Sequence, residues 1–430
     1  MKTDIHYGGA QLNLDIPEGN IDQIIHPWSG YQKADNGTVL CEAIAQGEAV
    51  HFQEEIAGKR LAVLVSDGTR DIPLEAIFAQ LYPLLNKCSL VRFFICTGTH
   101  NTDTNENHTI ARQIQNEAAN AGLSDFEIHI HDCQKDDFIN PGKTGRGTDV
   151  IFNAKITAED IFLVLSDVKV HYFAGYSNPI KSFVPGLCAF ATIEHNHSLA
   201  LDERSTSGLH PWHTNPARQD NPLAADQLEA MELIVKDRPV YALVTISSSG
   251  RIQWARFGAA QEVTAEAFDV VDEKNTHTTG PIDRLIVSSG GLPNDVDFYI
   301  AQRALELTKQ AVADDGGEVL FLAACPKGVG EPHTMENFYN RLTQPIDKIL
   351  ESIEGEYKLF SHKPYKLAQM INRLRRIWMY SQIPDDLIKA AHLWPTHDPQ
   401  KVVDDWLAEN PDTKITIVDG ANKLALYAKK

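Results

Sequence analysis

Short apolar runs that alternate with helix-like stretches are the feature that most restricts the fold of this chain. Each run has the length and composition of one buried strand, and polar or turn-forming residues follow it. In the first part of the chain the candidate strands are residues 60–66, 89–96, 126–131, 161–165 and 239–247. Helix-like residues 74–85 and 108–121 lie between them. This alternation is typical of a mainly parallel sheet that is covered by helices.

The pattern starts again at Arg284, after a polar stretch that ends in Gly280-Pro281 and that we interpret as a hinge. The second part contains candidate strands 285–289, 319–324 and 414–418 and candidate helices 295–313, 335–354, 365–379 and 398–407. We therefore predict an α/β protein of two α/β domains with mainly parallel sheets and an active site in the cleft between them. The predicted domains are residues 1–275 and 276–430.

The charge balance limits the kinds of partner. The chain has 39 Lys and Arg against 58 Asp and Glu, a net charge of −19, whereas a nonspecific nucleic-acid binder needs a basic face. No stretch approaches the roughly 18 apolar residues of a membrane span, and no signal-peptide pattern is visible. The six cysteines include no CxxC pair, which disfavours a zinc ribbon or a disulfide scaffold. We expect a cytoplasmic protein that binds neither nucleic acid nor membrane.

Polar loops follow three of the candidate strands, at residues 67–70, 97–100 and 167–171. In open α/β sheets ligands bind at the carboxyl ends of the strands, so these loops point to one site. Asp67-Gly68-Thr69-Arg70 offers groups that suit an anion, and the alternative is a capped turn with a solvent-facing arginine. His100 is a candidate general acid or base, and the alternative is an ordinary loop histidine.

The segment from His171 to His197 holds three histidines and one lysine in mostly apolar or small surroundings. Lys181 has three interpretations: a Schiff-base lysine, a buried ion pair, or a covalent cofactor anchor. His171, His195 and His197 are candidate metal ligands, with surface histidines as the alternative. Residues 187–194 read as helical, and on a helix His195 and His197 diverge by about 200°. We therefore expect only one of these two rings to face the site.

Together these residues resemble the nickel-pincer lactate racemase family, and the resemblance covers most of the chain. The matching residues are His171-Tyr-Phe-Ala-Gly-Tyr-Ser177, Lys181-Ser182, Pro185-Gly186, His197, Ser66-Asp67-Gly-Thr-Arg70, Thr97-Gly98-Thr99-His100 and Gly290-Gly291 with Pro293, Asp295 and Tyr299. The order of the first four elements is specific to this family.

The resemblance implies a nickel ion held by a pyridinium-derived mononucleotide that carries two sulfur donors. By match, Lys181 is the lysine that tethers this nickel-pincer nucleotide through a thioamide, and His197 is the nickel ligand. Asp67 and Arg70 are implied to bind the cofactor, which other, cofactor-synthesis proteins must make. The N-terminal domain is then the cofactor-binding domain, and the C-terminal domain closes over the substrate.

The resemblance also implies the reaction. His100 and His171 match the two acid/base histidines, which remove the hydroxyl proton from either enantiomer of a 2-hydroxy acid. The α-hydrogen leaves as hydride, a 2-keto acid forms, and return of the hydride to the opposite face inverts the centre. Arg70, already implied to bind the cofactor, is also a candidate for binding the substrate anion.

Substrate binding is implied for Tyr299, Arg303 and Lys366, but the match departs from lactate racemase here. Tyr299 and Arg303 lie four apart on the expected helix, and Arg303, a candidate carboxylate clamp, replaces a lysine. Ile300 replaces a glutamine, and Lys366 stands near the position of a tryptophan that lines the lactate site. We therefore expect a racemase or epimerase of a different 2-hydroxy acid, such as a hydroxy diacid or a sugar acid.

Two other functions remain open from the residues alone. One is a zinc-dependent hydrolase or lyase that uses the same histidines. The other is a non-catalytic ligand-binding relative, which would have no physical need for His100, His171, Lys181 and His197 together.

Overall fold

The computed structural model describes residues 2–28, 34–69, 72–248, 250–314 and 316–429, which fold as two compact units. The central unit is Ser29–Glu273, and the split unit combines Met1–Trp28 with Lys274–Lys430. The prediction that residues 1–28 belong to the N-terminal domain was wrong. Strand β3 (Ile21–Ile25) pairs in parallel with β19 (Ile415–Asp419), so the N-terminal segment completes the sheet of the other unit.

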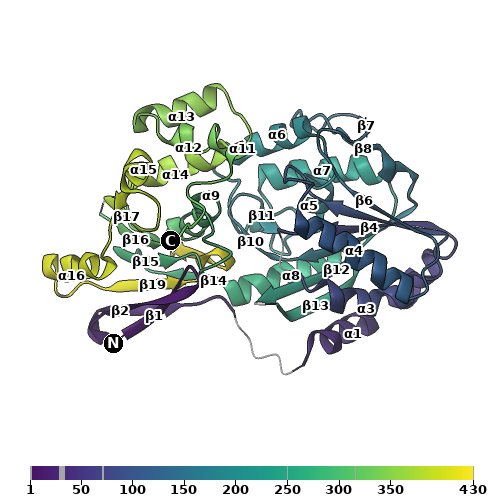
Figure 1. Cartoon of the computed structure of the whole chain (residues 1–430), viewed down its shortest axis with the longest axis horizontal. Coiled ribbons are helices and arrows are strands. Elements are labelled where there is room, and N and C mark those ends of the chain that lie inside the picture. Colours follow the sequence, from purple (N-terminus) through teal and green to yellow (C-terminus); the bar gives the residue numbers. More distant parts are fainter. Residues whose placement is uncertain (1, 29–33, 70–71, 249, 315, 430) are drawn as a thin grey trace. The chain divides into compact units, whose positions relative to one another are not determined.

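A six-stranded sheet forms the core of the central unit, in the order β13-β12-β9-β4-β5-β6 (Figure 1). Its strands are β4 (Arg60–Ser66), β5 (Leu90–Cys96), β6 (Phe126–Ile130), β9 (Ile161–Asp167), β12 (Val240–Ser248) and β13 (Arg251–Ala259). All neighbours are parallel except β12 and β13. Between their end residues β4 and β5 are wholly buried, as expected for apolar strands that are covered on both faces.

Helices cover this sheet on both faces. The helices are α1 (Asn36–Gln46), α2 (Ala49–Glu55), α3 (Leu74–Leu85), α4 (Asn105–Asn120), α5 (Ile180–Phe183), α6 (Phe190–Ser198), α7 (Pro222–Val235) and α8 (Ala260–Asn275). Side chains of α1, α3 and α4 share one core cluster with Leu61, Val63 and Val65 of β4. Helix α5 lies on the opposite face, where the rings of Phe162 and Phe183 are 5.5 Å apart.

The order of the strands places a switch point beside β4. From β4 the chain runs outward through β5 and β6, and it then returns to the other side of β4 to form β9 and β12. Loops that leave neighbouring strands in opposite directions open a crevice at their carboxyl ends, where α/β proteins bind ligands. The three predicted loops follow β9, β4 and β5, which are adjacent strands.

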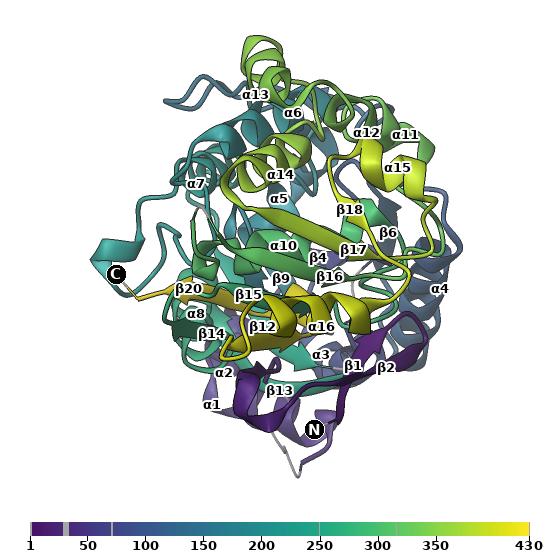
Figure 2. The same ribbon diagram turned by 90° about the vertical axis from the view of Figure 1, so that its left-hand side faces the viewer.

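The split unit contains a second six-stranded sheet, in which all neighbours are parallel. Its order is β18 (Trp394–Pro395), β17 (Arg376–Tyr380), β16 (Glu318–Leu322), β15 (Arg284–Ser288), β19 and β3. Helix α16 (Pro399–Glu409) and the hairpin of β1 (Lys2–Tyr7) and β2 (Ala10–Asp15) pack on it in one apolar cluster (Figure 2). The predicted α/β class with two mainly parallel sheets is confirmed.

Three long helices predicted for the split unit were wrong. The stretch 295–313 forms α9 (Phe298–Ala301) and α10 (Arg303–Thr308), and 335–354 is divided among α11 (Pro332–Met335), α12 (Tyr339–Leu342) and α13 (Ile346–Gly355). In 365–379, α14 (His362–Arg373) ends before β17. Asp297 is the N-cap of α9, where its carboxylate accepts a hydrogen bond from the backbone N–H of Ile300. The short helix α15 (Asp385–Ala390) completes the unit. Within the described ranges, no helix is long and apolar enough to cross a lipid bilayer.

Candidate active site

His100 and Asp67 form a hydrogen-bonded pair on the loops that follow β5 and β4. His100 Nδ1 lies 2.6 Å from Asp67 Oδ2, and the hydroxyl of Thr69 donates to Asp67 Oδ1 at 2.7 Å. The carboxylate is buried, whereas 47% of the His100 side chain is exposed. Because the carboxylate accepts the Nδ1 proton, neutral His100 presents an unprotonated Nε2. This arrangement suits a general base. Asp67, which we predicted to bind the cofactor, here orients the ring of His100.

Lys181 and His171 meet at the end of the loop that follows β9. Lys181 Nζ is 3.2 Å from His171 Nε2, and the backbone N–H of Ala174 donates to His171 Nδ1 at 3.3 Å. The ring of Phe173 lies against both, with its centroid 4.5 Å from the His171 ring and 5.6 Å from Lys181 Nζ. With Nδ1 accepting a bond, neutral His171 carries its proton on Nε2. That proton is donated to the lysine nitrogen only if the amine is neutral, which is its nucleophilic form.

Tight backbone packing fixes the position of Lys181. Strands β10 (Lys169–His171) and β11 (Gly175–Ser177) form a short hairpin that leads into α5, and Asn178 Oδ1 accepts the N–H of Ile180 at the start of this helix. A Cβ at Gly186 would lie 2.2 Å from the carbonyl oxygen of Ser182. Only glycine therefore fits where the chain turns back after the helix. The carbonyl of Gly186 accepts from Gly98 N, which joins this turn to the loop of His100.

His197 faces the same group of side chains, and His195 does not. Both are on α6, where the ring of His197 packs 5.5 Å from Phe173, whereas His195 is exposed and lies near the carbonyl of Arg146. Burial, then the charges of Lys181 and His100, lower the pKa of His197 to about 3. The imidazole is therefore neutral at pH 7, which is the form that binds metals. The helical spacing predicted this divergence of the two rings.

The predicted substrate residues lie in the split unit. Tyr299 is on α9 and Arg303 begins α10, so the prediction of one shared helix was wrong. Lys366 is on α14 and is buried, as is Lys363. Lys363, which we did not predict, donates to the carbonyl of Tyr299 at 2.6 Å and lies 4.0 Å from the centroid of its ring. Burial, then the charge of Arg303, hold the pKa of Lys363 well below its usual range.

Arg70 lies outside the described residues, so its predicted roles stay predictions. His210, in the irregular segment before α7, is fully buried, and burial, then the charges of His213 and Lys181, lower its pKa to about 3. Its sequence surroundings gave no signal beyond a cluster of His, Pro and Asn. Phe173 was visible only as an aromatic residue within the matching segment.

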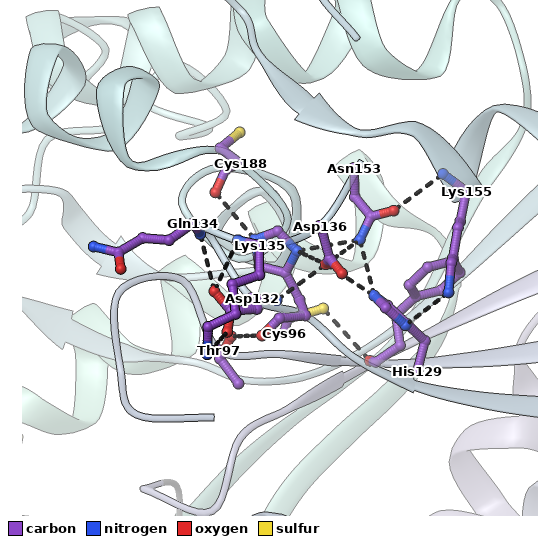
Figure 3. Close-up of polar contacts among 12 residues, drawn as sticks. Cys96, Thr97, His129, Asp132, Gln134, Lys135, Asp136, Asn153, Lys155 and Cys188 are labelled. Atoms are coloured by element: carbon purple, nitrogen blue, oxygen red, sulfur yellow. Dashed lines mark hydrogen bonds and ion pairs between the residues drawn. The ribbon is translucent and has the colours of Figure 1, made fainter. Parts of the chain in front are cut away.

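The predicted histidines do not make a three-ligand metal group of the zinc type. Among the described residues, the one group of three possible ligands whose donor atoms lie within 4.8 Å of one another is His129, His131 and Asp136. It contains none of the histidines on which the zinc-hydrolase alternative depended, and Figure 3 shows its polar contacts around His129 and Asp136.

Comparison with known proteins shows which proteins the chain resembles. Residues 7–208 match the family model described as the lactate racemase N-terminal domain. The chain is similar in sequence to lactate racemases. A lactate racemase from Thermoanaerobacterium thermosaccharolyticum is 24% identical over 441 residues, which cover 97% of this chain and 98% of the relative. One from Lactiplantibacillus plantarum is 24% identical over 352 residues, 79% of this chain and 78% of the relative. The predicted resemblance to this family is confirmed.

Solved structures share the fold. The lactate racemase apoprotein from T. thermosaccharolyticum aligns with a TM-score of 0.84 at 20% identity, over 99% of this chain and 100% of the other. A protein from Thermotoga maritima aligns with a TM-score of 0.59 at 14% identity, over 89% of this chain and 98% of the other.

The described side chains fit a nickel-pincer nucleotide that is tethered to a lysine. A primary amine and a neutral imidazole both lie near the ring of Phe173, and nickel accepts imidazole ligands. The amine of Lys181 lies 3.2 Å from His171 Nε2, and a neutral amine is the form that can be acylated. Lys181 would hold the nucleotide, and His197 would be the ligand from the protein.

Proposed function

We propose that this protein is a nickel-pincer-nucleotide-dependent racemase or epimerase of a 2-hydroxy acid. One observation carries the proposal: an amine, a neutral imidazole and two differently hydrogen-bonded histidines gather at the carboxyl ends of three adjacent strands. The amine is Lys181, the imidazole is that of His197, and the other two histidines are His100 and His171. The lactate racemase N-terminal domain over residues 7–208 supports it.

The two histidines are prepared for different roles toward the substrate oxygen. His100 presents an unprotonated Nε2, so it accepts the hydroxyl proton of one enantiomer. His171 presents an N–H at Nε2, so it donates a hydrogen bond to the substrate oxygen, and the His100 imidazolium returns the proton to that oxygen when the carbonyl is reduced again. When bound, the nucleotide supplies a reversible acceptor for the α-hydrogen as hydride. The proton that His100 takes from the hydroxyl is the one that it returns, so both histidines end the turnover in their starting protonation states and the enzyme is ready for another turnover.

We further propose that the substrate carries more polar groups than lactate. Lys363 and Lys366 are both buried in the split unit, and Arg303 is close enough to lower the pKa of Lys363. Lysine and arginine side chains are donors that bind carboxylate and hydroxyl oxygens, so three of them in one unit suit a substrate with more than one such group. A hydroxy diacid or a sugar acid meets this requirement, whereas lactate carries a single carboxylate.

The decisive experiment is the intact mass of the chain after expression in a host that makes the cofactor. We expect an adduct of several hundred daltons on Lys181 together with bound nickel. Lys181→Ala should abolish the adduct, whereas His171→Ala should retain it and lose racemisation. An unmodified chain from such a host, or full racemisation by His171→Ala in both directions, would contradict the proposal.

Substrate labelled at the α-carbon tests hydride return separately. A racemase that removes the α-hydrogen as a proton exchanges it with solvent, whereas hydride transfer keeps it on the substrate. With α-deuterated acid in ordinary water, we expect the inverted product to retain its deuterium. Washout of the label at the rate of racemisation would refute the mechanism.

A panel of acids tests the substrate class. Lys366→Met removes a cation, so kcat/KM for a hydroxy diacid should fall by about 10- to 100-fold, the value of a charge-assisted hydrogen bond. For lactate it should change by less than about 3-fold. Turnover confined to lactate would contradict the proposed class.

A further inference from the structure

Helix α7 begins at an asparagine whose side chain binds four backbone groups. Asn221 is almost fully buried, and its Oδ1 accepts the N–H of Ala224, which makes it the N-cap of the helix. Its Nδ2 donates to three carbonyl oxygens outside the helix, at 2.9 Å to Phe173, 3.2 Å to Thr206 and 3.1 Å to Leu209. The reversed amide would place an oxygen against three carbonyl oxygens, so these contacts fix the orientation of the amide.

The contact with Phe173 reaches the centre of the candidate active site. Phe173 lies in the turn between β10 and β11, and its ring centroid is 4.5 Å from that of His171 and 5.5 Å from that of His197. The carbonyl and the ring of one residue share a Cα, so a fixed carbonyl limits where the ring can lie. The turn is also tightly packed, because a Cβ at Gly175 would lie 1.9 Å from the Leu209 carbonyl oxygen.

The same helix supports the other two elements of the candidate site. Helix α7 packs against α5, which carries Lys181, and against α6, which carries His197. The contact with α6 includes a buried hydrogen bond of 2.8 Å from Asn196 Nδ2 to Asp226 Oδ2, and Asn196 directly precedes His197. One helix therefore contacts the turn of Phe173, the helix of the candidate tether and the helix of the candidate nickel ligand.

We propose that Asn221 is a positioning residue, which holds the Phe173 turn on helix α7 and so keeps the Phe173 ring against His171 and His197. The catalytic importance of these rings rests on the proposed function, whereas their packing does not. The described hydrogen bonds of Asn221 reach neither histidine. Its effect on the reaction therefore passes through Phe173.

The simpler role of Asn221 is that of a helix cap alone, and the chain contains an internal comparison. Asn215-Pro216 is a second asparagine-proline step just before Asn221-Pro222. Asn215 caps the short 3₁₀ helix η4 (Pro216–Arg218), where its Oδ1 accepts the N–H of Ala217. Asn215 is exposed, and within the described ranges its Nδ2 has no hydrogen-bond acceptor. A serine at either position can still cap a helix, but it has no amide to donate.

The route through Phe173 is tested on loaded enzyme, with rates normalised to the fraction that carries the adduct. Asn221→Ser retains a capping oxygen but loses the amide donors, so kcat should fall by about 10-fold while KM changes by less than about 3-fold. Asn215→Ser, the matched control, should leave kcat within about 2-fold. In the Phe173→Leu chain, Asn221→Ser should lower kcat by less than about 3-fold further, because the two residues act as one unit.

The ring positions are tested without the cofactor, by NMR of the full unloaded chain with ¹³C-labelled histidine rings. The ring current of Phe173 shifts the Hε1 signals of His171 and His197, which are assigned by their loss in His171→Gln and His197→Gln. We expect Asn221→Ser to move both signals and Asn215→Ser to leave both in place. The loss of a helix cap alone would not move them.

Unmoved histidine signals in Asn221→Ser would overturn the positioning role. So would an equal loss of kcat in Asn215→Ser, or fully multiplicative losses in the variant that combines Asn221→Ser with Phe173→Leu. A chain that never acquires the adduct would refute the proposed function, whereas the NMR result on the unloaded chain would stand by itself.

Hydrogen exchange in the unsubstituted chain keeps the proposal testable if Asn221→Ser fails to fold. The side-chain amide hydrogens of Asn221 are buried and bonded, so they should exchange with solvent at least about 100-fold more slowly than those of the exposed Asn215. Equal exchange rates would overturn the proposal.

Discussion

Asp67→Asn tests whether the buried carboxylate orients and charges His100. The variant keeps the shape of the side chain but removes the negative charge that lies 2.6 Å from His100 Nδ1. Two unit charges about 4 Å apart interact by about 4 kcal/mol at an effective dielectric constant of about 20. Because 47% of the His100 side chain is exposed, we keep about half of this value for the imidazolium that forms when His100 takes up the hydroxyl proton.

About 2 kcal/mol corresponds to a loss of about 30-fold in kcat. A rotated amide that presents its NH₂ to Nδ1 would also select the wrong tautomer and deepen the loss. The assay is racemisation by loaded enzyme, with the adduct quantified by mass. Because the two enantiomers of a racemase substrate are in equilibrium at equal concentrations, kcat/KM must fall equally in both directions.

The chain offers a matched control. Asp103 and His108 make a similar contact, 2.7 Å between Oδ1 and Nε2, but both side chains are exposed and neither is on the loop of the tether. Asp103→Asn should leave kcat unchanged within about 2-fold. A change of less than 3-fold in Asp67→Asn with the adduct intact, or a similar loss in Asp103→Asn, would refute the reasoning.

Three further predictions concern packing and pH. Gly186→Ala should lower the free energy of unfolding by about 1–3 kcal/mol in urea titrations, because the new Cβ would lie 2.2 Å from the Ser182 carbonyl oxygen. Gly280→Ala is the control: its Cβ would meet open space, so the free energy of unfolding should change by less than about 0.5 kcal/mol. Burial lowers the pKa of His210 to about 3, so below about pH 6.5 the unfolded chain takes up a proton that the folded chain does not. The free energy of unfolding therefore falls as the pH falls. The stability advantage of the unsubstituted chain over His210→Gln should shrink by about 2 kcal/mol between pH 7 and pH 5. Phe173→Leu should keep the adduct but lower kcat by about 10-fold, because one ring packs against both His171 and His197, and equal activity would show that this packing does not position them.

The part of the site that sequence predicted is the part that a periodic pattern controls. Buried strands are continuous apolar runs, so the ends of β4, β5 and β9 were visible, and with them the loops of Asp67, His100 and His171. That these strands are neighbours follows from parallel α/β topology. The orienting bond between Asp67 and His100 could not be predicted, because it joins residues 33 positions apart on two different loops.

The errors in the split unit have physical causes. Residues 295–313 carry enough helix-forming side chains to read as one helix, but Asp297 caps a new helix inside them. Residues 376–380, Arg-Ile-Trp-Met-Tyr, alternate in burial and pair with β16, so tertiary context turns them into a strand. Residues 1–28 were assigned by their position in the chain, whereas the pairing of β3 depends on a strand near residue 415.

Two His-x-His patterns show how the backbone decides what such a pattern means. On helix α6, His195 and His197 are about 200° apart, so one ring is exposed and the other reaches Phe173. At the end of strand β6, His129 and His131 are two residues apart on an extended backbone, so both rings face one side and meet the same carboxylate. The same His-x-His pattern therefore gives a single candidate nickel ligand on α6, whereas at the end of β6 it gives two histidines that contact one carboxylate. The other ring nitrogens have different neighbours: His131 Nε2 lies 3.0 Å from the Cys188 carbonyl oxygen, whereas His129 Nδ1 lies 3.2 Å from Lys155 Nζ.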